Sequence, residues 1–150
     1  MIDPQEDRLK DLCRDILFRD ETEDDDWSLE ECQVFCAEVD KSSWFIKRYG
    51  RIRPLAKDGR GCPDAQTGYI GNHLVIHLPI ETRKKWVIVH EVVHHVMPLW
   101  AEDHGPVYCG LLLYFTRKLY GTEKANRMRR LMKKAELVWE HGLAQNGRLE

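Results

Sequence analysis

The segment from Glu81 to Met97 constrains the fold of this chain more than any other. From Trp86 onward it is rich in apolar residues, above all valine, and Pro98 follows it directly. β-branched residues favour strands, but the segment is longer than a typical strand of roughly 3 to 10 residues, and its polar residues recur at helical spacing. The pattern therefore predicts a helix that is buried nearly all round and stops before the proline.

This predicted helix contains His90-Glu-Val-Val-His94, an HExxH pattern. Residues four apart on a helix project from one face, so both imidazoles can reach one ion at about 2.0 to 2.1 Å each. Glu91 lies beside them and can take a proton from a water that the metal has made more acidic. The spacing predicts a zinc site with Glu91 as the catalytic residue. The alternative is a pair of hydrogen-bonded core histidines, because buried imidazoles need partners.

A catalytic zinc site of this kind needs a third protein ligand. A metzincin would place glycine three residues after the second histidine and another histidine three beyond that, but those positions hold methionine and tryptophan, which excludes the class. His104 is the next histidine, where Gly105 permits a sharp turn and Pro106 fixes the first turn of a new helix. The sequence favours His104 as the third ligand, with Glu102 and Asp103 as the alternatives.

Other polar residues near the motif give weaker signals. Carboxylates often accept the second nitrogen of a liganding imidazole, and the candidates here are Glu102, Asp103 and Glu136. Two tyrosines of the following helix, Tyr108 and Tyr114, could stabilise an oxyanion, although aromatic residues on such a helix more often belong to the core. His95 points elsewhere around its helix and is not expected to be a ligand.

Helices are also predicted on the N-terminal side. Asp3–Glu6 combines an N-cap, a proline and a capping-box glutamate, and opens an amphipathic helix that continues to Leu17. The acidic run Asp20–Asp26 is expected to be a loop. Ser28–Glu31 is a second capping box, which opens a helix with its buried stripe over residues 32–39. A short helical turn is expected over Ser43–Tyr49.

Alternating patterns and turn sequences in the middle of the chain predict three short strands, near residues 51–57, 65–70 and 73–78. His73 and His77 share one face of the third strand and are expected at the surface or outside the ligand shell. An extended substrate could pair with an exposed sheet edge, for which the third strand is the candidate.

Two further helices are predicted after His104. The first runs from Pro106 to a stop at Gly121, and the last begins at Thr122 and extends to about His141. A chain of this length is expected to form one domain, over residues 1–142, with 143–150 as a flexible tail.

The composition excludes several classes of protein. No window approaches the roughly 18 to 20 uninterrupted apolar residues of a membrane span, and the N-terminus lacks the pattern of a secretory signal, so no membrane contact and a cytoplasmic location are expected. Five scattered cysteines without a CxxC pair suit reduced thiols. Cys32 and Cys36 lie four apart and could hold a second metal, but a small-residue helix seam is favoured.

Charge is distributed unevenly although the net charge is only -2. Residues 3–31 carry thirteen acidic and four basic residues, whereas residues 117–134 carry eight basic and one acidic. A basic stretch can contact nucleic acid, but on a helix it is more often a solvated face. Nucleic-acid contact is therefore an alternative rather than the main expectation.

Together with Asp103–Tyr108, the HExxH segment resembles the SprT-like zincins, whose third ligand lies in a similar His-Gly-Pro-x-aromatic segment. The likeness continues upstream to a small family of bacterial and phage zincin metallohydrolases, and covers roughly residues 34–139. It is carried there by Ser43–Phe45, Arg48–Gly50, Asp58–Gly61 and Leu78-Pro79. The SprT proteins proper act on proteins attached to DNA and carry a cysteine-rich zinc module, which this chain lacks.

The resemblance implies an α+β, minimal zincin-like fold: a short three-stranded sheet packed on the HExxH helix, with additional N- and C-terminal helices. It implies that His90, His94 and His104 bind Zn²⁺ and that Glu91 is the catalytic acid and base of a metallohydrolase, specifically a metallopeptidase acting on a peptide or protein. The alternative is a non-catalytic, zinc-stabilised module that binds protein or nucleic acid, in which four protein ligands would close the site.

Overall fold

The structure, a computed structural model, describes residues 5–13 and 27–148. The chain divides into two compact units: Asp25–His95, called here the sheet unit, and Met1–Asp24 with Val96–Glu150, called the helical unit. The expected loop Asp20–Asp26 and the expected helix end at Leu17 lie outside the described residues. Within the described part, no helix has the length and apolar character that crossing a membrane requires. The single domain expected over residues 1–142 stays a prediction.

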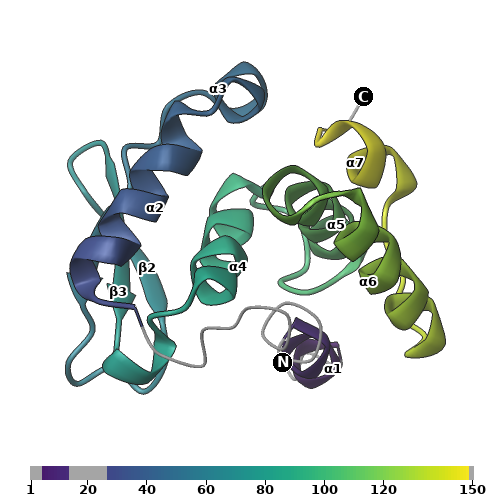
Figure 1. Ribbon diagram of the computed structural model, residues 1–150, viewed down its shortest axis with the longest axis horizontal. Coiled ribbons are helices and arrows are strands. Elements are labelled where there is room, and N and C mark those ends of the chain that lie inside the picture. The colour runs from purple at the N-terminus through teal and green to yellow at the C-terminus, as the bar shows by residue number, and fades with distance from the viewer. Residues whose placement is uncertain (1–4, 14–26, 149–150) are drawn as a thin grey trace. The chain divides into compact units, whose positions relative to one another are not determined.

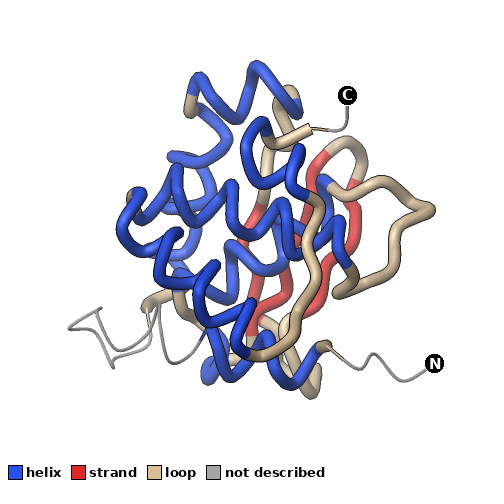
Figure 2. The backbone as a smooth tube through the Cα atoms, turned by 90° about the vertical axis from the view of Figure 1, so that its right-hand side faces the viewer, coloured by secondary structure: helices blue, strands red, loops and turns tan. Residues whose placement is uncertain are grey.

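The sheet unit confirms the α+β class and the three-stranded sheet (Figures 1 and 2). Helix α2 contacts β1, and β3 leads through a single 3-10 turn, η2, into the helix that carries the HExxH pattern. The elements in chain order are α2 (Leu29–Lys41), α3 (Ser43–Tyr49), β1 (Leu55–Asp58), β2 (Gln66–Ile70), β3 (His73–Leu78), η2 (Ile80–Thr82) and α4 (Lys85–Val96).

The sheet is mixed and has the order β1-β3-β2. β1 pairs with β3 in parallel, with Leu55 opposite Val75, and β2 pairs with β3 antiparallel, with Gly68 opposite the same valine. The expectation that the third strand offers an exposed edge is therefore wrong: β3 is central, and its residues Leu74–Ile76 are buried. A strand that reads as a nearly continuous apolar run is typical of a position with neighbours on both sides.

Local sequence signals define α2. The Ser28 hydroxyl oxygen accepts a hydrogen bond from the Glu31 backbone N–H at 3.1 Å, and the Glu31 carboxylate accepts one from the Ser28 N–H at 3.2 Å, which confirms the capping box. Cys32 and Cys36 are buried on this helix. The pKa of Cys36 is raised to about 12, mainly because its thiol is buried and secondly because of the neighbouring Cys32. A thiol that stays protonated at neutral pH suits packing rather than metal binding.

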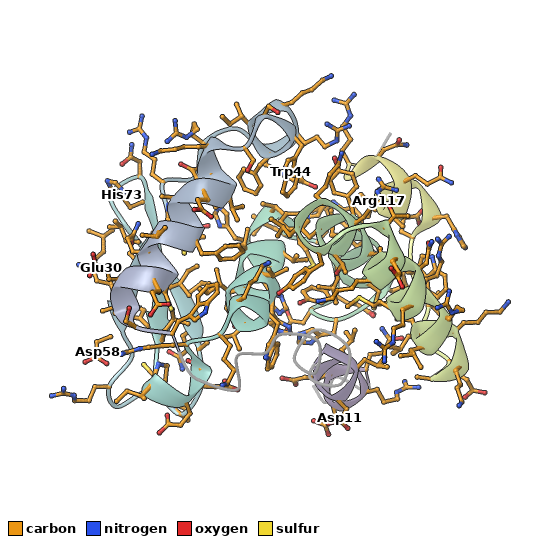
Figure 3. All side chains as sticks on the ribbon, in the orientation of Figure 1. Asp11, Glu30, Trp44, Asp58, His73 and Arg117 are labelled. Carbon is orange, nitrogen blue, oxygen red and sulfur yellow. The ribbon has the colours of Figure 1, made fainter. Side chains whose placement is uncertain are left out.

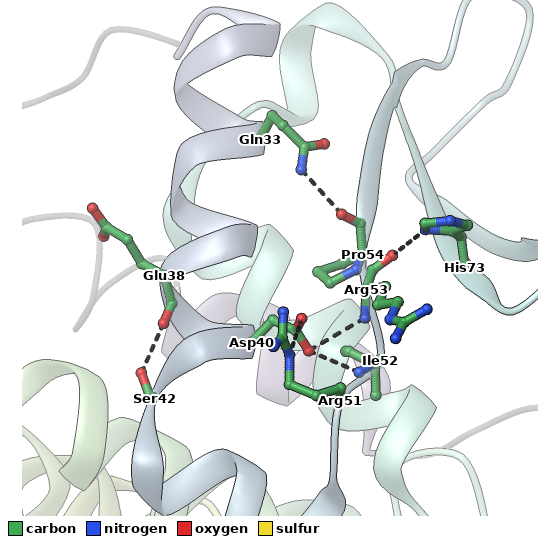
Figure 4. Close-up of polar contacts among 9 residues, drawn as sticks. All are labelled: Gln33, Glu38, Asp40, Ser42, Arg51, Ile52, Arg53, Pro54 and His73. Atoms are coloured by element: carbon green, nitrogen blue, oxygen red, sulfur yellow. Dashed lines mark hydrogen bonds and ion pairs between the residues drawn. The ribbon is translucent and has the colours of Figure 1, made fainter.

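Asp40, at the end of α2, is a buried carboxylate that holds the following loop (Figure 4). Its Oδ1 accepts hydrogen bonds from the backbone N–H groups of Ile52 at 2.7 Å and Arg53 at 3.2 Å, while Oδ2 accepts one from Arg51 Nε at 2.8 Å. Arg53 has a φ of 47°, a conformation that costs a non-glycine residue energy. These bonds hold the backbone there, and β1 begins only at Leu55 rather than near residue 51.

We expect Asp40→Ala to lower the free energy of unfolding by about 2 to 3 kcal/mol, because it leaves the buried Ile52 N–H and the partly buried Arg53 N–H without their acceptor. Desolvation raises the pKa of Asp40, but the hydrogen bonds from Ile52, Arg51 and Arg53 outweigh it and leave the pKa below its ordinary value of 3.8. The stabilisation is thus present above about pH 4 and is lost as the pH falls through the folded-state pKa.

Urea titrations of the wild type and Asp40→Asn between pH 3 and pH 7 measure this contribution. Asparagine keeps one oxygen acceptor without the charge, so the wild-type advantage over Asp40→Asn should shrink on acidification. If the wild type exceeds Asp40→Asn in free energy of unfolding by the same amount at pH 3 and pH 7, the charge of Asp40 does not stabilise the fold.

The helix predicted over Glu81–Met97 forms, but it begins later than expected. The first residues make η2 instead, where the Thr82 hydroxyl donates to the Pro79 carbonyl at 2.7 Å and Arg83 Nε donates to the Leu78 carbonyl at 3.1 Å. These side-chain bonds close a separate turn, and α4 starts at Lys85. Apolar burial along α4 confirms the prediction of helix over strand despite its valines.

The helical unit contains α1 (Glu6–Cys13), α5 (Pro106–Tyr120), α6 (Thr122–Lys134) and α7 (His141–Asn146). Helix α5 contacts both α6 and α7, and α1 contacts α6. The prediction of one final helix to about His141 is wrong, because α6 ends at Lys134 and Glu136 takes a positive φ of 60°. Residues 143–146, assigned from the sequence to a tail, belong to α7, where Leu143 is buried.

Candidate metal centre

Helix α4 presents two histidines of the HExxH pattern to a common point. His90 is buried and His94 is half-buried, and their rings meet edge to face with centroids 4.8 Å apart. The two Nε2 atoms lie 3.2 Å from each other. The arrangement follows from the four-residue spacing on one helix, as the sequence predicts.

This separation fits a shared metal ion. Two nitrogens at 2.0 to 2.1 Å from a tetrahedral zinc ion stand about 3.3 to 3.4 Å apart, and the observed value is 3.2 Å. A hydrogen bond between two neutral rings would also bring these atoms together if one ring donates and the other accepts. The donor set, two neutral imidazole nitrogens on one rigid helix, suits zinc and neighbouring divalent metals.

Glu91 follows His90 on the same helix and is half-buried. Its position, one residue after His90, places it around the helix from the histidine pair rather than in line with it. The role of Glu91 in proton transfer stays a prediction.

His104 belongs to the helical unit and lies just before α5. Its side chain is buried, and its ring packs edge to face against Tyr108 with centroids 4.9 Å apart. Gly105 is the N-cap and Pro106 the first residue of α5, as expected. His90 and His94 belong to the sheet unit, so the role of His104 as their partner in a metal site stays a prediction.

The backbone of His104 is held by Gln5, a residue that the sequence did not single out. The Gln5 side-chain amide donates to the His104 carbonyl oxygen, while its Oε1 accepts from the Val138 N–H at 3.4 Å. The same amide nitrogen lies 3.6 Å from Cys109 Sγ. Gln5 therefore connects three segments of the helical unit at the candidate ligand. No local sequence signal marks this role, because its partners lie about a hundred positions away along the chain.

His95 does point away from its neighbouring histidine, as expected. Its Nδ1 lies 2.5 Å from the Tyr69 hydroxyl, and burial lowers the pKa of the ring, so a neutral ring can accept this hydrogen bond. Tyr69 lies on β2, so the contact joins an edge strand to the HExxH helix. No pattern in the sequence marks Tyr69, because only the order of the strands brings it to α4.

The other polar residues proposed near the motif differ in burial: the tyrosines lie in the core and the carboxylates at the surface. Tyr108 and Tyr114 are fully buried, which supports the core interpretation over an oxyanion role. The three carboxylates considered above, Glu102, Asp103 and Glu136, are exposed. His73, labelled in Figure 3, places Nδ1 3.0 Å from the Arg53 carbonyl oxygen and thus contacts the loop before β1. His77 is half-buried on the same strand.

The chain was compared with family models, curated proteins and solved structures. No family model matches it, and no curated protein or solved structure gives a significant match. The resemblance to SprT-like zincins therefore stays a prediction, and the case for a metal rests on the residues themselves.

Proposed function

We propose that this protein is a zinc-dependent metallohydrolase, and specifically a metallopeptidase, with His90, His94 and His104 as the ligands. The observation that carries the proposal is the 3.2 Å between the Nε2 atoms of His90 and His94, which suits a tetrahedral ion. Ten positions separate His94 from His104, which is well within reach of the intervening chain. Three protein ligands leave one position open, as in catalytic rather than structural zinc sites.

A zinc ion held by His90, His94 and His104 would supply Lewis acidity, which makes a water more acidic. Glu91 would act as the general base that takes the proton of the attacking water, and as the general acid that returns it to the departing amine. Val92 and Val93, next to Glu91 on α4, are buried, and an apolar environment strengthens electrostatic interactions with a reacting carbonyl.

A peptide would bind by pairing with β2. This strand is at one end of the sheet order, and Tyr69 and Ile70 are exposed on it. An edge strand offers a row of backbone donors and acceptors to an extended chain. Because Tyr69 also contacts His95 on α4, a peptide on β2 would lie beside the helix that carries Glu91.

The decisive test is metal analysis of the purified protein and of His104→Ala. We expect one zinc per wild-type chain, and a loss of affinity of roughly 100-fold in the variant, because one ligand of three or four accounts for about 3 kcal/mol of zinc binding. Peptide cleavage by the wild type should stop on chelation and return with zinc. Full zinc retention by His104→Ala would move the third ligand elsewhere, and a fourth protein ligand on the ion would favour a non-catalytic module.

Gln5 offers a subtler prediction about the third ligand. Gln5→Ala should weaken zinc binding by about tenfold, since hydrogen-bonding partners outside the ligand shell commonly contribute 10- to 100-fold. The matched control is Arg8→Ala, in the helix α1 that directly follows Gln5, because Arg8 donates to the Ala135 carbonyl at 2.7 Å. Competition with a chromogenic chelator measures the zinc affinity of both variants. Equal losses in the two variants would show that Gln5 only anchors α1.

A further inference from the structure

The helical unit contains two adjoining cavities that the proposed hydrolase does not use. They share Asn126, Arg129 and Trp139 in their walls and have volumes of about 140 and 430 Å³. Arg130 and Lys133 line the larger cavity, and Arg117 and His141 line the smaller. We call the pair the basic hollow. No carboxylate is among the described residues that line it.

The positive charge of the hollow comes mainly from one helix. α6 carries six basic residues and a single acidic one, Glu123 in its first turn. Across the described ranges, Arg129, Arg130 and Lys133 form no ion pair with a carboxylate. Uncompensated like charges gathered on one wall repel one another and favour an anionic ligand. Since the three residues fall within about one helical turn, they match a compact group of phosphates better than a long track of them.

One of these cations is already oriented. The Arg129 guanidinium donates to the side-chain oxygen of Asn126, one turn earlier on α6. On the other side, Arg117 Nη2 donates to the Gln145 carbonyl oxygen at 2.7 Å, which ties α5 to α7 at the wall of the smaller cavity (Arg117 is labelled in Figure 3). A guanidinium held in place loses less side-chain entropy when it binds a phosphate bidentately.

Trp139 gives the hollow an aromatic wall. It lies between α6 and α7, is half-buried, and its ring stands 5.5 Å from that of His141 at an interplanar angle of 56°. A partly exposed indole next to clustered cations is the combination that binds a planar base and its phosphates together. An inorganic anion alone would gain nothing from the indole.

We propose that the basic hollow binds a nucleotide, with its phosphates at Arg129, Arg130 and Lys133 and its base against Trp139. The site lies wholly within the helical unit and does not depend on the metal. The sequence offered nucleic-acid contact or a solvated face as the role of the basic residues in 117–134. We infer instead that several of them bind the phosphates of a small ligand.

Isothermal titration of the full chain with ATP, AMP and inorganic pyrophosphate tests the proposal. Arg130→Ala and Lys133→Ala should each weaken ATP binding by about tenfold, as for the loss of a charge-assisted hydrogen bond, with a smaller effect on AMP. Trp139→Leu should weaken ATP binding about tenfold and leave pyrophosphate binding unchanged, because only the base stacks. Lys124→Ala is the matched control, since Lys124 lies on the same helix but places its ammonium over the Tyr120 ring, 5.0 Å from the centroid.

Three results would overturn the nucleotide site. The first is no ATP binding at millimolar concentration, and the second is an equal loss in Lys124→Ala, which would indicate attraction by net charge alone. The third is binding of a single-stranded oligonucleotide but not of ATP, which would make the surface a nucleic-acid contact. Arg130 and Lys133 are exposed, so their variants should fold and give a clear result even if Trp139→Leu does not.

Discussion

Glu91→Gln is expected to abolish peptide hydrolysis while zinc stays bound. Glutamine keeps the size and the hydrogen-bonding oxygen of the side chain but cannot accept the proton of the attacking water. General acid-base catalysis contributes about 10² to 10⁴ in rate, so kcat should fall by at least that range, whereas KM should change little. The measurement is steady-state cleavage of a fluorogenic peptide by zinc-loaded protein.

Glu81→Gln provides the control for this substitution. It removes the same charge from the sheet unit, but Glu81 is exposed in η2 and lies outside the HExxH pattern. Its activity should match the wild type. Turnover by Glu91→Gln at the wild-type rate would rule out Glu91 as the base, although it would leave metal binding untouched.

His94→Ala should remove zinc almost completely. The variant loses one of two nitrogens held 3.2 Å apart on a rigid helix, and one ligand is worth roughly 100-fold in affinity, or about 3 kcal/mol. Elemental analysis after dialysis against a weak chelator, with a competition titration, measures the loss. Activity should disappear with the metal.

His95→Ala is the comparison, one position further along α4. It removes an imidazole whose partner is Tyr69, so zinc content should stay at the wild-type level. Stoichiometric zinc in His94→Ala would support the alternative of two hydrogen-bonded core histidines. Equal zinc loss in both variants would point to a general disturbance of the helix.

The features predicted well from the sequence are those that depend on neighbours along the chain. Ser28 and Glu31 form a capping box within four residues, and the His90 and His94 nitrogens meet because a helix returns to the same face after four positions. Each requires only local conformation. The sequence pattern therefore carries enough information to place them.

The features that were missed depend on contacts between distant residues. Asp40 has its partners in the loop before β1, and Gln5 contacts His104, which lies about a hundred positions later in the chain. The central position of β3 likewise depends on which strands pair, which an apolar run alone does not determine. The break after Lys134 follows from the left-handed conformation of Glu136, a residue type that carries no such preference.

The mixed sheet implies an order of assembly. β2 and β3 are joined by a tight turn at Gly71-Asn72, and their antiparallel pairing starts with Ile70 opposite His73. Such a hairpin between strands adjacent in sequence can form within about 1 to 10 μs. β1 pairs in parallel with β3 only after the chain between them has closed a loop that contains β2. The hydrogen bonds from Asp40 to Ile52 and Arg53 fix the loop that leads into β1. We therefore expect Asp40→Ala to slow mainly the docking of β1 and to leave formation of the β2–β3 hairpin unchanged.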